Sequence, residues 1–436
     1  MALNGSGIWH AEQAWLGHRA ENVLIEVVGG RIEKVTEGVT APPGATGLRG
    51  WTIPGFANVH SHAFQHVLRG ATESGGGNFW EWRQEMYRTA EGWTAGSYLE
   101  HCRGVFREML QAGITAVGEF HYLHGRGNEL GEAVALAATL EGIRLTLIDA
   151  CYLQGGVDGR PLEGAQKSFS DGDVDGWIAR MDDLTVGEEV RIAAAIHSVR
   201  AVDALSMRKV AEWARKRHAP LHIHLAEQPA EVEECIAVHG CTPVQLLERE
   251  GILGPDLTAV HAIHVDEQDI ALLGKQRVSI VACTTSERDL GDRVGPLGRL
   301  AAAGSPICVG SDSNAVIDML EEARGLELDQ RRATGRRVHH QPDELFRAAT
   351  IGGMRALGWP AGDLKAGVLA DFITIDAPEI TAKNKLDLGY LMFCRSAHDV
   401  NNVVVGGTTL VQAGANLGAP SGPSGHLPGE RGGHSR

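Results

Sequence analysis

The stretch NVHSHAFQH, residues 58–66, places two histidines, His60 and His62, one serine apart. On a β-strand, residues i and i+2 point to the same face, so the two imidazole rings would lie side by side. That geometry suits a shared cation. Two unrelated polar histidines in a loop would give the same letters in a chain with 20 histidines, so the rest of the sequence must decide.

Eight apolar runs of strand character follow one another along the chain, separated by helical segments such as 95–113 and 204–218. The runs end in NVHSH, AVGEFHY, LTLIDACY, AAAIHSVR, LHIHLAEQ, AVHAIH, IVACTTSE and ICVGSDS. Because a (β/α)₈ barrel builds its active site from the C-terminal ends of all its strands, reactive residues at these ends predict an α/β fold of the TIM-barrel type. A doubly wound open sheet is the alternative, but its sites gather at one switch point.

The two ends of the chain predict a smaller β unit. Residues 22–38 indicate a hairpin around Gly29 and Gly30, and residues 364–378 and 400–414 indicate further short strands. The Gly-, Pro- and Ser-rich end of the chain lacks apolar periodicity and should be disordered. The expected division is 1–50 for the N-terminal part of the small domain, 51–360 for the barrel, 361–415 for the C-terminal part and 416–436 for the tail.

Composition favours a small-molecule partner. The 436 residues are 43% hydrophobic and 22% charged, which is ordinary for a globular protein with a large core. The net charge of −15 disfavours non-specific binding to nucleic acid or to anionic membranes. No apolar run approaches the roughly 20 residues that span a bilayer, and a cytoplasmic location is expected. The seven scattered cysteines are expected to be reduced thiols.

The fifth and eighth runs supply further metal-ligand residue types. His222 and His224 share a face at the end of the fifth run, where one ligand is enough, and Asp312 ends the eighth. With His60 and His62, His224 and Asp312 would make three imidazoles and one carboxylate, which leaves a position for water on a zinc-like divalent ion. Iron or manganese would accept the same ligands, and a separate structural role for each residue is the other interpretation.

In this order, the segments VHSH, HIHLAE, VHA and GSDS resemble the amidohydrolase superfamily. These are metal-dependent hydrolases on a distorted (β/α)₈ barrel with a small β-sandwich domain, and the resemblance covers about residues 1–415. One HxH, one HxxE and no bridging lysine at the fourth strand are similar to the deaminase branch, which uses one metal ion.

Longer segments resemble one family within that branch, the formimidoylglutamate deiminases. They are NVHSHAFQ, FWEWRQEMYR, EFHYLHG, IHSVRAV, HIHLAEQ with EVEEC, and LGD after CTTSE. The resemblance implies hydrolysis of N-formimidoyl-L-glutamate to N-formyl-L-glutamate and ammonia, a reaction of histidine degradation. It also implies a homodimer.

Carried over residue by residue, the resemblance assigns roles within the site. The metal ligands would be His60, His62, His224 and Asp312. Glu227, His261 and Asp312 would move protons, although His264 lies three residues after His261 and could face the pocket instead. The substrate would contact Gln65, Arg83, Tyr122, His197 and Arg200, with the two arginines holding its carboxylates.

Less specific interpretations exist for several of these residues. Glu227 could be a surface helix carboxylate, Arg83 a solvated charge and Tyr122 a packing aromatic. The family pattern also changes after the seventh run, where Arg288, Asp289 and Arg293 add charge beside the predicted pocket and leave the exact substrate open. The competing functions are an aminohydrolase of a purine, pyrimidine or adenosine-like ring, and a non-catalytic metal-binding protein.

Overall fold

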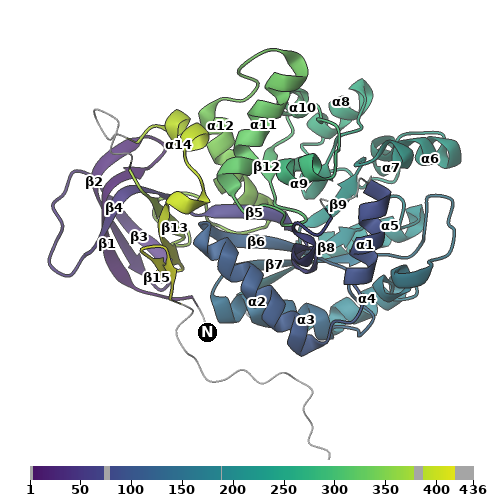
Figure 1. Ribbon diagram of the computed structural model, residues 1–436, viewed down its shortest axis with the longest axis horizontal. Helices are drawn as coiled ribbons and strands as arrows, with labels where there is room; N and C mark the ends of the chain where they lie inside the picture. Colours follow the sequence, from purple (N-terminus) through teal and green to yellow (C-terminus); the bar gives the residue numbers. More distant parts are fainter. Residues whose placement is uncertain (1–2, 73–78, 188, 378–385, 418–436) are drawn as a thin grey trace, which may run out of the picture.

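The structure is a computed structural model that describes residues 3–72, 79–187, 189–377 and 386–417. It contains two sheets (Figure 1), a parallel barrel and a smaller sheet at one end of the molecule. The barrel strands are hydrogen-bonded in chain order: β5 (Phe56–Ser61), β6 (Ile114–His121), β7 (Arg144–Cys151), β8 (Val190–Ile196), β9 (Leu221–Leu225), β10 (Leu257–His261), β11 (Ser279–Ala282) and β12 (Ile307–Val309). A parallel bridge between Ser61 and Asp312 links the last strand to the first. The predicted α/β barrel is confirmed.

Helices surround the barrel, and the sequence explains where several of them begin. They are α1 (Phe79–Thr89), α2 (Ala95–Gln111), α3 (Glu129–Glu141), α4 (Val174–Asp183), α5 (Ala204–Lys216), α6 (Pro229–His239), α7 (Pro243–Arg249), α8 (Glu267–Lys275), α9 (Thr284–Asp289), α10 (Leu297–Ala303), α11 (Met319–Thr334), α12 (Pro342–Arg347), α13 (Gly353–Ala356) and α14 (Leu388–Cys394). Thr94 and Ser97 form a capping box at α2, and the Asp203 carboxylate accepts from Leu205 and Ser206 at α5. Short η segments complete the set: η1 (Ala63–Leu68), η2 (Gly164–Phe169), η3 (Ala348–Gly352) and η4 (Ala397–Asp399).

The smaller sheet joins both ends of the described chain. Its order is β16 (Ala415–Asn416), β15 (Thr408–Gln412), β14 (Val400–Val405), β13 (Phe372–Ile375), β4 (Thr46–Pro54), β1 (Gly7–Trp15), β2 (Arg19–Val28) and β3 (Arg31–Thr36). The predicted hairpin is present, with Val28 opposite Arg31. The boundary expected at residue 50 falls inside β4. The predicted disorder of the tail concerns residues that, from 418 onward, lie outside the described part of the chain.

Burial patterns follow from these positions. β6 and β7 are buried at every residue because parallel strands are covered on both faces, whereas β2 alternates because one of its faces meets solvent. A buried ion pair joins the two sheets, since Arg144 of β7 donates to Asp371, next to β13, at 2.6 and 2.9 Å.

All seven cysteines are free thiols. Among the described residues, no helix combines the length and apolar character needed to cross a membrane.

Candidate active site

The predicted metal ligands at the ends of β5 and β12 are held together by their own backbones. The Asp312 N–H donates to the His60 carbonyl at 2.9 Å, and the His62 N–H donates to the Asp312 carbonyl at 2.8 Å. Gly310 lies so close that a Cβ atom there would stand 2.8 Å from the backbone nitrogen and oxygen of His60. The glycine of GSDS is therefore needed to bring Asp312 beside the histidine pair.

Buried side chains reinforce this junction. Asn58 donates to Ser311 Oγ at 2.6 Å and accepts from the Ser311 N–H at 2.9 Å. Asn314 donates to the His62 carbonyl at 3.1 Å, and its own Oδ1 accepts from Ser311 Oγ. These bonds tie the two strand ends into one rigid unit, which is the support that a precise site requires.

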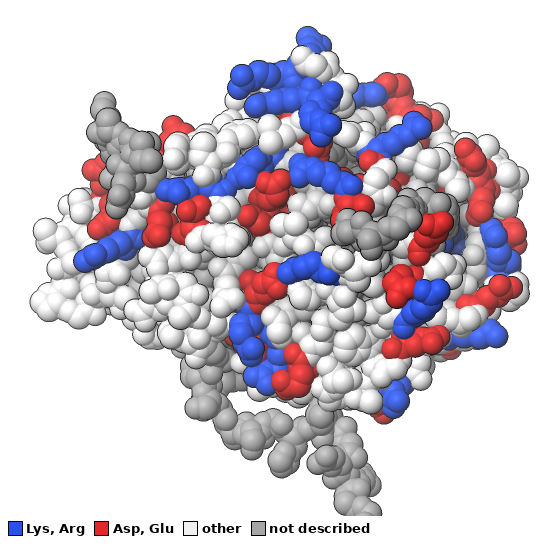
Figure 2. Space-filling model, viewed as in Figure 1, with Lys and Arg blue, Asp and Glu red and all other residues white. Residues whose placement is uncertain are grey.

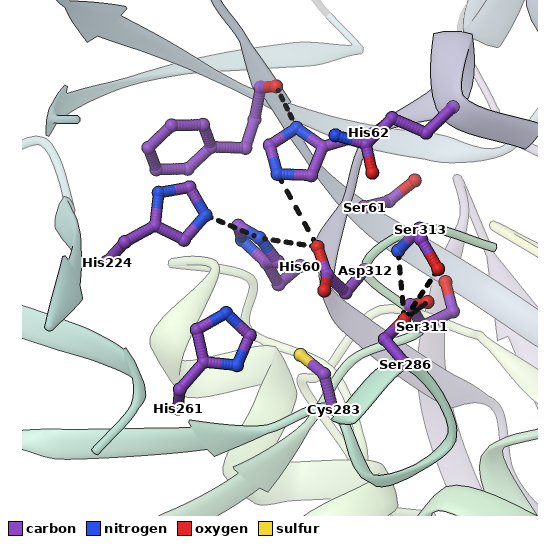
Figure 3. A network of polar contacts seen from close by, with 12 residues as sticks. His60, Ser61, His62, His224, His261, Cys283, Ser286, Ser311, Asp312 and Ser313 are labelled. Carbon is purple, nitrogen blue, oxygen red and sulfur yellow. Dashed lines mark hydrogen bonds and ion pairs between the residues drawn. The ribbon is translucent and has the colours of Figure 1, made fainter. Parts of the chain in front are cut away.

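Donor atoms of residues at the ends of β5, β9 and β12 converge inside the barrel (Figure 3). The Nε2 atoms of His60 and His224 are 3.1 Å apart. Asp312 Oδ1 lies 3.4 Å from His60 Nε2 and 3.5 Å from His62 Nε2. All four residues are buried, and the structure thus brings together the four predicted ligands.

The histidines present the form of imidazole that binds a cation. His62 Nδ1 donates to the Phe120 carbonyl at 2.9 Å and His224 Nδ1 donates to the His197 carbonyl at 3.1 Å, which leaves each Nε2 as a lone pair directed at the cluster. Burial, followed by the neighbouring histidines, lowers the pKa of His62 to about 3 and holds that of His224 well below its ordinary value. Neutral nitrogens beside one carboxylate fit a divalent ion. His222 is fully buried but does not join this group of donors.

His261 faces the cluster, and His264 does not. His261 Nδ1 contacts Glu287 Oε1 at 3.2 Å, and its Nε2 lies 3.9 Å from Glu227 Oε1. Burial opposes protonation, but Glu287, Glu227 and Asp312 together raise the pKa of His261 to about 10. His264 is half-buried and does not line the cavity.

Two of these residues adopt unusual backbone conformations. His261 has φ 77° and Asp312 has φ 46°, values in the left-handed region that non-glycine residues rarely adopt. Such conformations cost about 1–3 kcal/mol each and persist where surrounding structure imposes them, frequently at active sites. Here they turn both side chains from the strand ends toward the donor cluster.

Arg200 lies between two glutamates. Its guanidinium is 3.6 Å from Glu227 Oε2 and 3.7 Å from Glu231 Oε2. Burial raises the pKa of Glu231 to about 7, although Arg200 opposes the shift. Because Glu231 holds a proton more readily than an ordinary glutamate, part of the charge on Arg200 is left for a bound anion.

A cavity of about 50 Å³ opens onto the donor cluster and is lined by the remaining predicted site residues. Its lining comprises His62, Gln65, Trp82, Arg83, Met86, Tyr87, Tyr122, Tyr152, Phe169, His197, Arg200, His224, Glu227, His261, Leu290 and Asp312. Gln65 donates to the Tyr122 hydroxyl at 3.3 Å, and Arg83 lies over the Tyr87 ring at 5.1 Å. The predicted metal ligands His62, His224 and Asp312, the predicted proton-handling residues and two arginines therefore line one cavity.

The added charge after β11 lies largely outside this cavity. Arg288 of α9 pairs with Glu321 and Asp329 of α11 at 2.8 and 3.0 Å, so its side chain faces that helix. Of the segment between residues 288 and 293, only Leu290 belongs to the cavity lining described above. Arg288 therefore lies beside the cavity, with its side chain paired to α11.

Several contributors to the site were not predicted from the sequence. Glu287 orients His261, Glu231 contacts Arg200, and Tyr152 lines the cavity. Cys283 offers a sulfur within 4.8 Å of donor atoms of His261 and Asp312, but burial raises the pKa of this thiol well above its ordinary value. Glu287 and Cys283 lie in the CTTSE segment, directly after β11. Their position at the end of a barrel strand could have indicated that they belong to the site.

Comparisons with known proteins agree with this geometry. Residues 51–410 match the Amidohydrolase family. The chain is 32% identical over 424 residues to a formimidoylglutamate deiminase of Pseudomonas aeruginosa, covering 92% of this chain and 93% of that protein. It is 29% identical over 369 residues to a 5-methylthioadenosine/S-adenosylhomocysteine deaminase of Natronomonas pharaonis, covering 83% and 81%.

Solved structures show the same fold. The crystal structure of an amidohydrolase from Brucella melitensis superposes with a TM-score of 0.85 at 32% identity and covers 94% of this chain and 96% of that one. An adenosine deaminase from Xanthomonas campestris, crystallised with bound zinc, gives a TM-score of 0.82 at 23% identity, covering 95% and 94%. With its barrel, its converging histidines and aspartate, and these relatives, the chain belongs to the amidohydrolase family.

Proposed function

We propose that this protein hydrolyses N-formimidoyl-L-glutamate to N-formyl-L-glutamate and ammonia. One observation carries the proposal: two arginines, Arg83 and Arg200, line the same cavity as Glu227, His261 and Asp312. A guanidinium fork pairs with a carboxylate through two hydrogen bonds, so two arginines suit a substrate with two carboxylates. The similarity to the deiminase of Pseudomonas aeruginosa supports the same substrate.

The ligand set would be His60, His62, His224 and Asp312, holding one divalent ion, most simply zinc. When bound, such an ion lowers the pKa of water from far above neutrality to about 7 and makes hydroxide accessible at neutral pH. Uncharged imidazoles suit the positive charge of such an ion. The Asp312 carboxylate suits it as well, because His60 holds the pKa of Asp312 below its usual value despite burial. These properties support metal binding.

The remaining side chains would handle protons. The water oxygen adds to the formimidoyl carbon, and the C–N bond to the terminal nitrogen then breaks. A divalent ion beside His261 would lower the pKa of that imidazole and let it lose its proton. His261 and Asp312 would then accept the protons that water loses, and Glu227 would deliver one to the departing nitrogen, because nitrogen leaves as neutral ammonia. Glu287 keeps His261 in place through its Nδ1 contact, so Nε2 faces the reaction.

A second candidate is deamination of an adenosine-like ring. Relatives with that activity are 26–30% identical to this chain, and aromatic side chains such as Tyr122 and Phe169 line the cavity. The narrow cavity requires less opening for a linear amidine than for a nucleoside, and an uncharged ring would leave Arg83 and Arg200 without an anion. Both points favour formimidoylglutamate.

Ammonia release measured in parallel on N-formimidoyl-L-glutamate, 5-methylthioadenosine, guanine and cytosine tests the proposal. We expect kcat/KM for formimidoylglutamate to exceed the others by several orders of magnitude. A preference for a nucleoside or a free base would support the second candidate, and metal binding without turnover would favour a binding protein. By resemblance alone, we also propose a homodimer that acts in the cytoplasm.

A further inference from the structure

A larger cavity, of about 860 Å³, lies on the opposite side of the barrel from the active site. It is lined by residues at or just before the beginnings of four strands, namely Arg191 of β8, Pro220 before β9, Thr258 of β10 and Ile307 of β12, and by residues of α12, η3 and α13. The active site is built at the other ends of the same strands. Its size falls within the range of about 300–1,000 Å³ typical of small-molecule sites.

The lining of this lower cavity is strongly cationic. It includes five arginines and two histidines: Arg191, Arg215, Arg277, Arg347, Arg355, His218 and His340. Its acidic residues are Asp256 and Glu344. Such an excess is unusual in a chain whose net charge is −15.

Both acidic residues of the lining already have partners within the protein. Asp256 pairs with Arg215 at 3.2 Å, and Glu344 accepts from the Gln341 N–H at the start of α12. Within the described part of the chain, the guanidinium groups of Arg277, Arg347 and Arg355 make neither hydrogen bonds nor ion pairs. On the face in Figure 2, positive and negative side chains are interspersed except at the top of the view, where several positive side chains gather.

Two buried polar atoms in the lining also have no partner. His340 is only 4% exposed, and its Nε2 finds no hydrogen-bond partner among the described residues. The hydroxyl of Ser305, equally buried at 4%, is also unsatisfied. Buried polar atoms are normally hydrogen-bonded, and leaving one unpaired costs about 1–3 kcal/mol, so these atoms indicate a ligand in the cavity.

The environment of Arg191 also indicates that an anion binds in this cavity. Its guanidinium stacks on Trp359 at 4.5 Å, and burial together with Arg144 lowers its pKa. A bound anion would reverse that direction. This contact restrains the guanidinium, so less side-chain entropy would be lost on binding.

We propose that the lower cavity binds a small molecule bearing phosphate groups, of about nucleotide size or less. Guanidinium forks that come from separate elements can contact several oxygens of one polyvalent anion, and His340 Nε2 and Ser305 Oγ can each donate one further hydrogen bond. The site is separate from the proposed catalytic cavity, so the ligand would not compete with substrate.

Isothermal titration of the metal-loaded protein with inorganic pyrophosphate tests this inference. We expect saturable binding at one site per chain that weakens as salt rises. Arg347→Gln and Arg355→Gln should each weaken it about tenfold or more, as loss of a charge-assisted hydrogen bond does. Arg19→Gln, an exposed charge change on β2, is the matched control and should not alter the affinity.

Circular dichroism and metal content establish that each variant is folded. Absence of saturable binding, or equal weakening by Arg19→Gln and the cavity variants, would overturn the inference. Citrate titrated in place of pyrophosphate distinguishes phosphate from carboxylate recognition, and tighter citrate binding would also contradict it. None of these readouts depends on ammonia release, so the outcome is independent of the proposed reaction.

Discussion

His60 and Asp312, 252 positions apart in the sequence, contact each other through both backbone and side chain. The Asp312 N–H donates to the His60 carbonyl at 2.9 Å, while Asp312 Oδ1 lies 3.4 Å from His60 Nε2. Closing the barrel and assembling the donor cluster are therefore one structural event. A change that disturbs the junction of β5 and β12 should disturb metal binding as well.

Glu227→Gln should remove turnover and keep the metal. The amide preserves the size of the side chain but cannot transfer the proton, and a positioned acid–base group contributes about 10²–10⁴-fold to rate. Glu227 is not among the converging metal donors. Steady-state kcat with metal analysis checks this, and full activity in the variant would contradict the assigned role.

Arg200→Ala should raise KM for formimidoylglutamate by about tenfold or more, the usual effect of losing a charge-assisted bond to a carboxylate. Arg288→Ala removes the same charge outside the cavity, where Arg288 pairs with α11, and should leave KM unchanged. Initial-rate measurements on both variants give the two KM values and test whether Arg200 binds the substrate. Equal KM values for Arg200→Ala and the unmodified protein would remove Arg200 from the substrate site.

Arg144→Met should destabilise the protein by about 3–5 kcal/mol, because it leaves the Asp371 carboxylate buried without its counter-ion. The double variant Arg144→Met/Asp371→Asn should recover much of that loss, since Asn keeps an acceptor for the Gly406 N–H. Urea unfolding of the unmodified protein, of Arg144→Met, of Asp371→Asn and of the double variant measures the coupling. Additive losses would show that the two residues do not stabilise each other.

Glu119 should make stability fall as pH rises. Burial raises its pKa to about 8, one oxygen accepts from the Ala63 N–H at 2.6 Å, and the other has no partner among the described residues. The folded state therefore keeps this proton, while the unfolded state loses it near pH 4.5. The free energy of unfolding should decrease between about pH 4.5 and 8, on the order of a few kcal/mol.

Glu119→Gln cannot ionise and lacks this contribution. The stability difference between the unmodified protein and the variant should thus shift steadily against the unmodified protein over that pH range. Urea titrations at pH 5, 6, 7 and 8 measure it, with equal metal content in both proteins. A constant difference would mean that Glu119 is already ionised in the folded state.

Much of the fold could be predicted because periodicity and strand-end chemistry report local structure. The eight barrel strands, the hairpin around Gly29 and the helix 95–113 all appear at the expected places. The strand Gly7–Trp15 was not predicted, since its identity depends on pairing with β2 and β4 rather than on local pattern. Non-local pairing leaves little trace in a short segment.

The candidate site also contains residues that the sequence indicates and residues that only the structure reveals. HSH and HIH could be recognised because ligand residues follow strand periodicity. Glu231 lies in the quoted EVEEC segment, but its role could not be recognised, because it depends on contact with Arg200 in the turn after β8. The choice between His261 and His264 also required the backbone, since φ 77° at His261 turns that ring toward Glu227.

Zinc titration into chelator-stripped protein, with ammonia release as the readout, tests the central claim most directly. We expect no activity without metal, recovery that rises linearly to one equivalent of zinc per chain, and no recovery in His60→Ala. Full activity in the stripped protein, or equal zinc-dependent recovery in His60→Ala, would contradict a single ion held by His60, His62, His224 and Asp312.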